Sequence, residues 1–203
     1  MIGILTGDIV NSRKLSSEIW MDGLKELLNV FGENPTEWEI YRGDEFQLEI
    51  KNPEDALRIA LRIKAYFKTL KLDARMSIGF GDKTYAANKI SESNGTAFLR
   101  SGEVFETLKK QKINLAINSS DEAFNAEINM MLRLSLTFMD NWLVQPAELV
   151  LISIENPSLS QEEIGMKLGI NQAAVSKRQK RAQFHLVMEM ERYFRNKIKT
   201  INT

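Results

Sequence analysis

Two acidic residues in the N-terminal half stand where paired carboxylates can hold a metal ion. Asp8 ends the apolar run that begins at Ile2, and Asp44 lies in the segment Arg42 to Phe46, at an expected hairpin tip. A strand end and an adjacent hairpin meet at one sheet edge, so the two carboxylates are expected to converge. Magnesium prefers such oxygen ligands, commonly together with nucleotide phosphates. The pattern predicts that Asp8 and Asp44 bind magnesium with a nucleotide. In the alternative, both residues serve only a surface and a turn.

The C-terminal segment has the charge of a surface that meets phosphate. From Asn171 to the end, eight basic residues stand against two acidic ones, a net charge of +6. Because the 27 basic and 27 acidic residues of the chain balance, residues 1–170 carry −6. Such an asymmetry is typical of a basic region that contacts nucleic acid. The alternative is a solvated helix face.

The same segment has the spacing of a helix-turn-helix over residues 161–180. Ser160 and Glu163 match a capping box, Gly169 suits the turn, and Asn171 can cap the second helix. Apolar residues are spaced to form a small core: Ile164, Leu168, Ile170 and Val175. Arg178 departs from the pattern, because an apolar residue is usual at that position.

Seven residues of the second helix are expected to contact double-stranded DNA. Four near its start would enter the major groove, where Gln and Lys can bond base edges: Gln172, Ala173, Ser176 and Lys177. Three basic residues further on would bind backbone phosphates: Arg178, Lys180 and Arg181. The alternative is a helical module that binds protein. The lone His185 is interpreted as a packing or surface residue.

The elements that must position the acidic pair follow a β, α, β-hairpin, α, β order. The expected strands and helices are 2–8, 18–31, the hairpin 38–50, 53–70 and 74–80. This order is typical of a ferredoxin-like α+β fold, an antiparallel sheet with helices on one face. A helix over 95–112, a strand over 113–117 and a long helical stretch over 121–144 follow. We therefore predict an α/β domain over residues 1–120, a helical connector over 121–145 and an all-α domain over 146–203.

The acidic motifs resemble those of class III nucleotide cyclases and GGDEF-type cyclases. Residues Arg42 to Phe46 are similar to the GGDEF signature, with Arg42 in place of its first glycine. Aligning Gly95 to Arg100 with the class III pattern puts Arg100 on the phosphate-binding Arg and Thr96 on a position that is usually Asn. This resemblance implies that Arg100 binds nucleotide and that the catalytic set is incomplete.

A more specific resemblance covers roughly residues 1–115. Four short motifs in this order resemble the SatD family: Thr6 to Arg13, Tyr41 to Asp44, Arg75 to Gly79 and Gly95 to Gly102. The resemblance implies a relative of the cyclase fold and carries over no defined activity.

Composition narrows the chemistry further. The chain has no Cys and one His, which excludes disulfides, zinc ribbons and thiol nucleophiles. The apolar N-terminal run is too short for a signal peptide or a membrane span, so a cytoplasmic protein without membrane contact is expected. The last helix, with Leu186, Met190 and Phe194, fits a homodimer interface or burial against the rest of the chain.

The sequence thus predicts a transcription regulator with a degenerate cyclase-like sensor domain that binds a nucleotide, and a DNA-binding helix-turn-helix. It favours a regulator over an enzyme. The alternative is a magnesium-dependent nucleotide-processing enzyme that the helix-turn-helix localises. A third interpretation makes both halves protein-interaction surfaces.

Overall fold

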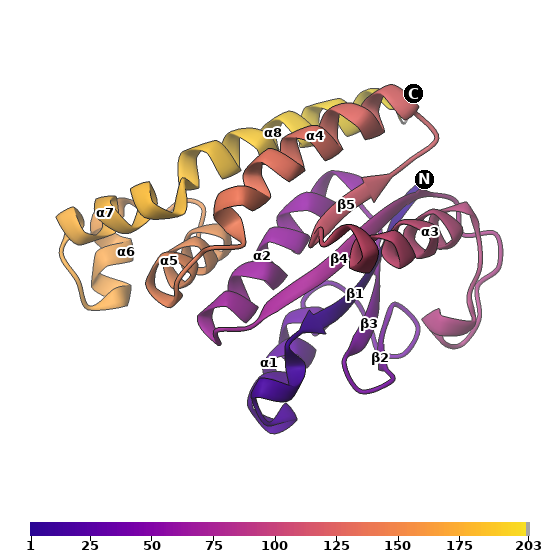
Figure 1. Ribbon diagram of the computed structural model, residues 1–203, viewed down its shortest axis with the longest axis horizontal. Helices are drawn as coiled ribbons and strands as arrows, with labels where there is room; N and C mark the ends of the chain where they lie inside the picture. The colour runs from indigo at the N-terminus through magenta and orange to yellow at the C-terminus, as the bar shows by residue number, and fades with distance from the viewer. Residues whose placement is uncertain (202–203) are drawn as a thin grey trace.

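Five strands form one mixed sheet. In the computed structural model, which describes residues 1–201, the strands are β1 (Ile2–Val10), β2 (Trp38–Tyr41), β3 (Glu45–Ile50), β4 (Asp73–Gly81) and β5 (Leu115–Asn118). Their order is β2-β3-β1-β4-β5 (Figure 1). Strand β1 is antiparallel to β3 and β4, whereas β5 is parallel to β4. The mixed α+β class is confirmed, and β5 adds a parallel edge to the expected antiparallel sheet.

Helices occupy most of the remaining chain. Within residues 1–201 they are α1 (Ser17–Asn29), α2 (Ala56–Thr69), α3 (Thr96–Gln111), α4 (Glu122–Met139), α5 (Val144–Glu155), α6 (Gln161–Leu168), α7 (Gln172–Ala182) and α8 (Phe184–Ile201). Short 3₁₀ turns cover Ser12–Lys14, Pro53–Asp55 and Ile90–Glu92. None of the helices in this range is long and apolar enough to cross a membrane.

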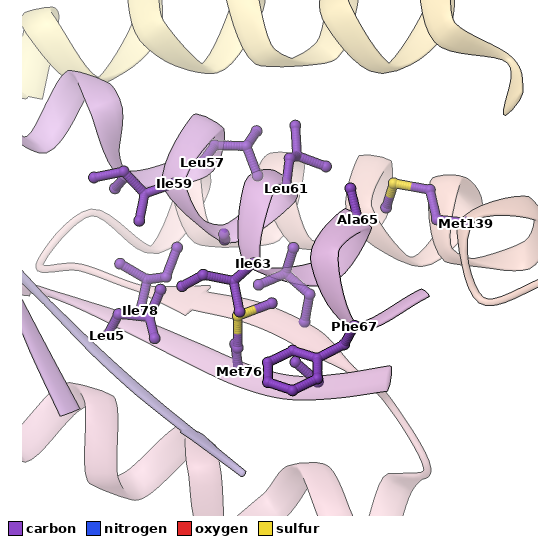
Figure 2. Close-up of a cluster of buried hydrophobic side chains, with 14 of the residues drawn as sticks. Leu5, Leu57, Ile59, Leu61, Ile63, Ala65, Phe67, Met76, Ile78 and Met139 are labelled. Atoms are coloured by element: carbon purple, nitrogen blue, oxygen red, sulfur yellow. The ribbon is translucent and has the colours of Figure 1, made fainter. Parts of the chain in front are cut away.

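The main core lies between one face of the sheet and the helices above it. Leu5, Met76 and Ile78 point from the strands toward Ile63 and Phe67 of α2 (Figure 2). All five side chains are fully buried. Their positions follow from sequence period, because alternate strand residues and every third or fourth helix residue face the same side.

Helix α3 lies on the opposite face of the sheet, which corrects the expectation that all helices cover one face. Gly79 and Gly81 put no side chain on this face of β4, so α3 packs directly on the strand at these two positions. A Cβ on Gly79 would lie 2.2 Å from the carbonyl oxygen of Ala97 and 2.3 Å from the backbone nitrogen of Ser101. Because α3 crosses over between β4 and β5, those two strands can run parallel.

The C-terminal helices extend the same core. Phe194 of α8 packs against Phe80 of β4 and Phe124 of α4, with ring centroids 5.9 Å and 6.0 Å away. Buried residues of α4, α5 and α8 belong to the cluster that covers the sheet, whereas α6 and α7 join a separate small cluster on α5. The boundaries at residues 120 and 145 stay a prediction, although buried side chains are continuous across them.

The expected long helix over 121–144 is interrupted. Helix α4 ends at Met139 and α5 begins at Val144, so Pro146 lies in the first turn of α5, where its missing N–H is tolerated. Side chains of the intervening turn have tertiary partners. Asp140 accepts a hydrogen bond from Lys64, and the indole of Trp142 donates to the carbonyl of Ala182 at 3.0 Å.

Candidate nucleic-acid interface and the predicted metal site

A short turn joins α6 and α7 and is fixed at both ends by caps. Ser160 accepts a bond from the backbone N–H of Glu163, whose carboxylate accepts from the Ser160 N–H at 2.7 Å. The Ser160 hydroxyl also donates to this carboxylate, and the two bonds that the Glu163 carboxylate accepts hold its pKa below its ordinary value, the bond from the backbone N–H having the larger effect. Gly169 ends α6 with φ 64°, and Asn171 caps α7 by accepting from the Ala174 N–H at 2.9 Å.

A glycine allows the turn to approach α6 closely. A Cβ on Gly165 would lie 2.7 Å from the carbonyl oxygen of Ile170, so a larger residue would push the turn away. Ile164 and Val175 then meet Leu149 of α5 in a buried cluster. These contacts fix the angle between α6 and α7, and α5 supports both.

Arg178 is part of this support, because its guanidinium is paired with an acidic residue of α5. Its guanidinium contacts the carboxylate of Glu148 on α5 at 2.9 Å, and its side chain is 14% exposed. The ion pair explains why a charged residue occupies a position that is usually apolar. The side chain of Arg178, which is predicted to contact DNA, therefore already has Glu148 as an ion-pair partner.

The other predicted DNA contacts form one exposed surface. Gln172, Ala173, Ser176, Lys177, Lys180 and Arg181 are all exposed, while Val175, Gln179 and Ala182 of the same helix are buried. Within residues 1–201, Lys177, Lys180 and Arg181 have no acidic partner. We call these six exposed residues the α7 surface.

Most other basic residues of the C-terminal segment have carboxylate partners. Arg195 pairs with Asp55 at 2.8 Å, Lys197 with Glu127 at 3.1 Å and Lys199 with Glu54 at 3.1 Å. The net charge of +6 therefore overstates the surface that can meet phosphate. Apart from Arg192 on α8, the cations of this segment that lack an acidic partner in the described chain lie on α7.

The predicted metal residue Asp8 is held by two cations. Its carboxylate lies 3.0 Å from Nη1 of Arg75 and 3.3 Å from Nζ of Lys109, and its side chain is 11% exposed. Lys109 also lies 4.0 Å from Glu45, which pairs with Asp8 across β1 and β3. A metal ion at Asp8 would have to displace at least one of these positive groups. The sequence did not reveal this, because both cations lie far along the chain from Asp8.

Asp44 lies at the same end of the sheet as Asp8, one residue before the Glu45 that pairs with Asp8, whereas Arg100 lies elsewhere. Asp44 accepts a hydrogen bond from Ser12 at 2.5 Å and lines a shallow pocket that Asp8 does not line. Arg100 donates to the carbonyl of Phe80 at 2.6 Å. The β4 residue that pairs with Asp8 is Arg75, and Phe80 lies five residues further along the same strand. Five strand residues span about 17 Å, so Arg100 is held far from Asp8.

Arg100 is thus not brought to the end of the sheet that holds Asp8 and Asp44. Residues 1–201 contain no group of three or more His, Asp or Glu side chains placed to hold a metal ion. What the face beneath α3 does hold is a chain of hydroxyls: Ser101 donates to Thr6 at 2.8 Å, and Ser77 donates to the Ser101 carbonyl at 2.8 Å. This chain attaches α3 to the sheet.

Sequence comparison identifies a family over nearly the whole chain. No curated protein matches the sequence. The sequence profile of the SatD family matches residues 2–202, and so includes the C-terminal helices as well as the motifs of the first half. The chain belongs to the SatD family.

Proposed function

We propose that this protein is a transcription regulator that binds double-stranded DNA through a helix-turn-helix formed by α6 and α7. The observation that carries the proposal is the α7 surface: Lys177, Lys180 and Arg181 lack acidic partners in residues 1–201, while neighbouring cations are paired. A polar face at a helix start, flanked by unpaired cations, suits base contacts with adjacent phosphate contacts. The capped turn and the support by α5 hold this face in one orientation.

The first half is proposed to be a degenerate cyclase-like domain that acts as a sensor. The order β2-β3-β1-β4 is compatible with a ferredoxin-like arrangement. The cations around Asp8 and the distant position of Arg100 argue against the alternative, a magnesium-dependent enzyme. A nucleotide bound to this half would change the affinity for DNA.

DNA binding by the full chain is expected to be strongly salt-dependent, because each phosphate contact releases counterions. Lys180→Ala should weaken binding to all duplex sequences and reduce the slope of log K against log salt by about 1. Gln172→Ala and Lys177→Ala should instead alter which sequences are selected from a random duplex library. Fluorescence anisotropy at several salt concentrations measures affinity and slope.

Lys110→Ala is the matched control for these variants. Lys110 is an exposed lysine on α3, without an acidic partner in the described part of the chain, and its loss changes net charge equally. Its affinity and salt slope should equal those of the unaltered protein. The proposal is wrong if the folded full chain shows no affinity for duplex DNA at low salt.

Cyclisation of nucleotides is expected to be absent. Catalysis requires groups placed for the transition state, and Arg100 does not lie at the end of the sheet where Asp8 and Asp44 are found. We therefore expect no cyclic product from ATP or GTP with magnesium or manganese, measured by chromatography of the reaction mixture. Product that disappears in Asp44→Asn would restore the enzyme interpretation. A nucleotide-dependent change in DNA affinity would instead support the sensor role.

A further inference from the structure

A groove beside α7 gathers cations from both halves of the chain. It has a volume of about 410 Å³ and is lined by Lys68, Lys71 and Arg181 together with Leu72 and residues 142–146. No acidic residue lines it. Lys68 and Lys71 come from the end of α2 and the turn after it, whereas Arg181 comes from the last turn of α7.

The three cations differ in whether an acidic side chain neutralises their charge. Lys68 is 11% exposed, lies 2.8 Å from Asp73 and also donates to the backbone carbonyl of Asp140. Lys71 and Arg181 are exposed, and within residues 1–201 neither has an acidic partner. The groove therefore presents two uncompensated positive charges.

The groove continues the α7 surface. Arg181 follows Lys177 by four residues, which places both side chains on the same side of the helix. A strand of phosphates that follows this side of α7 past Arg181 would next meet Lys71. No acidic side chain lines the groove between these two residues.

Both walls of the groove are held in place. Lys71 lies in a tight turn with φ 59°, and the N–H of Leu72 bonds the carbonyl of Phe67 at 2.9 Å. On the other side, the indole of Trp142 bonds the Ala182 carbonyl at 3.0 Å, which ties the end of α7 to the turn before α5. The positions of the two free cations are thus set before any ligand binds.

We propose that this groove binds a backbone phosphate of the DNA, with Lys71 and Arg181 as its two cationic contacts. The inference rests on the proposed DNA binding and extends it, because Lys71 lies about 100 residues before α7 and outside the helix-turn-helix spacing. Phosphate contacts carry no base information. Lys71 should therefore raise affinity for every duplex and leave sequence preference unchanged.

The test compares Lys71→Ala with Lys112→Ala in the full chain. Lys112 is a closely matched control, since it is also an exposed lysine with positive φ, 54°, just after a helix. It follows α3, on the other face of the sheet from α2. By anisotropy with duplex DNA at about 0.1 M salt, Lys71→Ala should weaken binding about fivefold to tenfold and reduce the salt slope by about 1. Lys112→Ala should change neither, and Lys71→Arg should retain both.

Each outcome is distinguishable from failure of the proposed function. If the unaltered protein binds DNA and Lys71→Ala binds with the same affinity and slope, the groove inference is wrong while DNA binding stands. If the unaltered protein binds no DNA, both are wrong. A second arm measures thermal stability with inorganic phosphate alone. Stabilisation that Lys71→Ala abolishes, without an effect on DNA binding, would assign the groove to free phosphate and overturn the inference.

Discussion

Replacement of Lys64 by methionine is expected to lower the free energy of unfolding by about 3 kcal/mol. Lys64 is fully buried, and its ammonium lies 2.8 Å from a carboxylate oxygen of Asp73 and 2.5 Å from one of Asp140. Methionine retains the apolar stem of lysine but removes the charge, so the buried carboxylate of Asp73 loses one of its two cations and Asp140 loses the cation it pairs with. The loss of unfolding free energy should lie at the low end of the range for removing one partner of a buried ion pair, because Lys68 still contacts Asp73 at 2.8 Å.

Urea unfolding followed by tryptophan fluorescence measures this loss. Lys25→Met is the control: Lys25 lies 3.5 Å from Asp22 on the surface of α1, with half of its side chain exposed. Such a pair contributes less than about 1 kcal/mol. Equal losses in the two variants would mean that the buried network does not stabilise the protein more than a surface pair does. The double variant Lys64→Met, Asp140→Asn should recover part of the loss, because Lys64 is the cation that pairs with the Asp140 carboxylate and no unpaired charge then remains on residue 140.

This network also matters for the proposed function. It joins α2, the start of β4 and the turn between α4 and α5. Helix α5 in turn carries Leu149 and Glu148, which hold α7. A change in the sheet that moved the start of β4 would therefore be transmitted to the α7 surface through directly contacting groups.

Sequence periodicity was enough to predict most helices and strands. Alternating spacing marked β3 and β4, three-to-four spacing marked α2, and the caps at Ser160 and Asn171 marked α6 and α7. These features are local, since a cap bonds a backbone group two or three residues away. The exposed positions of α7 followed from the same local pattern.

Ion pairs between distant residues could not be predicted in the same way. Arg178 was expected to contact phosphate because nothing in its neighbourhood shows that Glu148 faces it from α5. Asp8 was expected to bind metal because Arg75 and Lys109 reach it only once β4 and α3 are placed. In each case the side chain's partner depends on tertiary register, which residue type and spacing do not contain.

The sequence contains a signal for the position of α3 in the two glycines near the end of β4. Gly79 and Gly81 are two residues apart in β4, so both lie on the same face of the strand and leave its last part without side chains on that face. A strand face of this kind allows another backbone to approach closely. This signal, read alone, would have favoured a helix on the second face of the sheet.

Replacement of Gly79 by alanine is accordingly expected to destabilise the protein by about 3 kcal/mol or more. The added Cβ would lie 2.2 Å and 2.3 Å from backbone atoms of Ala97 and Ser101, and backbone cannot swing aside as a side-chain end can. Helix α3 would have to move away from β4, which would break the bond from Ser101 to Thr6. Thermal and urea unfolding of the full chain measure the effect.

Gly102→Ala is the matched control on the helix itself. A Cβ at Gly102 meets nothing within 4 Å, and alanine in a helix interior is favoured over glycine by about 0.5–1 kcal/mol. The same substitution should therefore stabilise the protein at residue 102 and destabilise it at residue 79. If Gly79→Ala were as stable as the unaltered protein, α3 could not pack directly on β4. The contact between Lys109 and Asp8 would then lose its structural basis, because Lys109 is held over the sheet by α3.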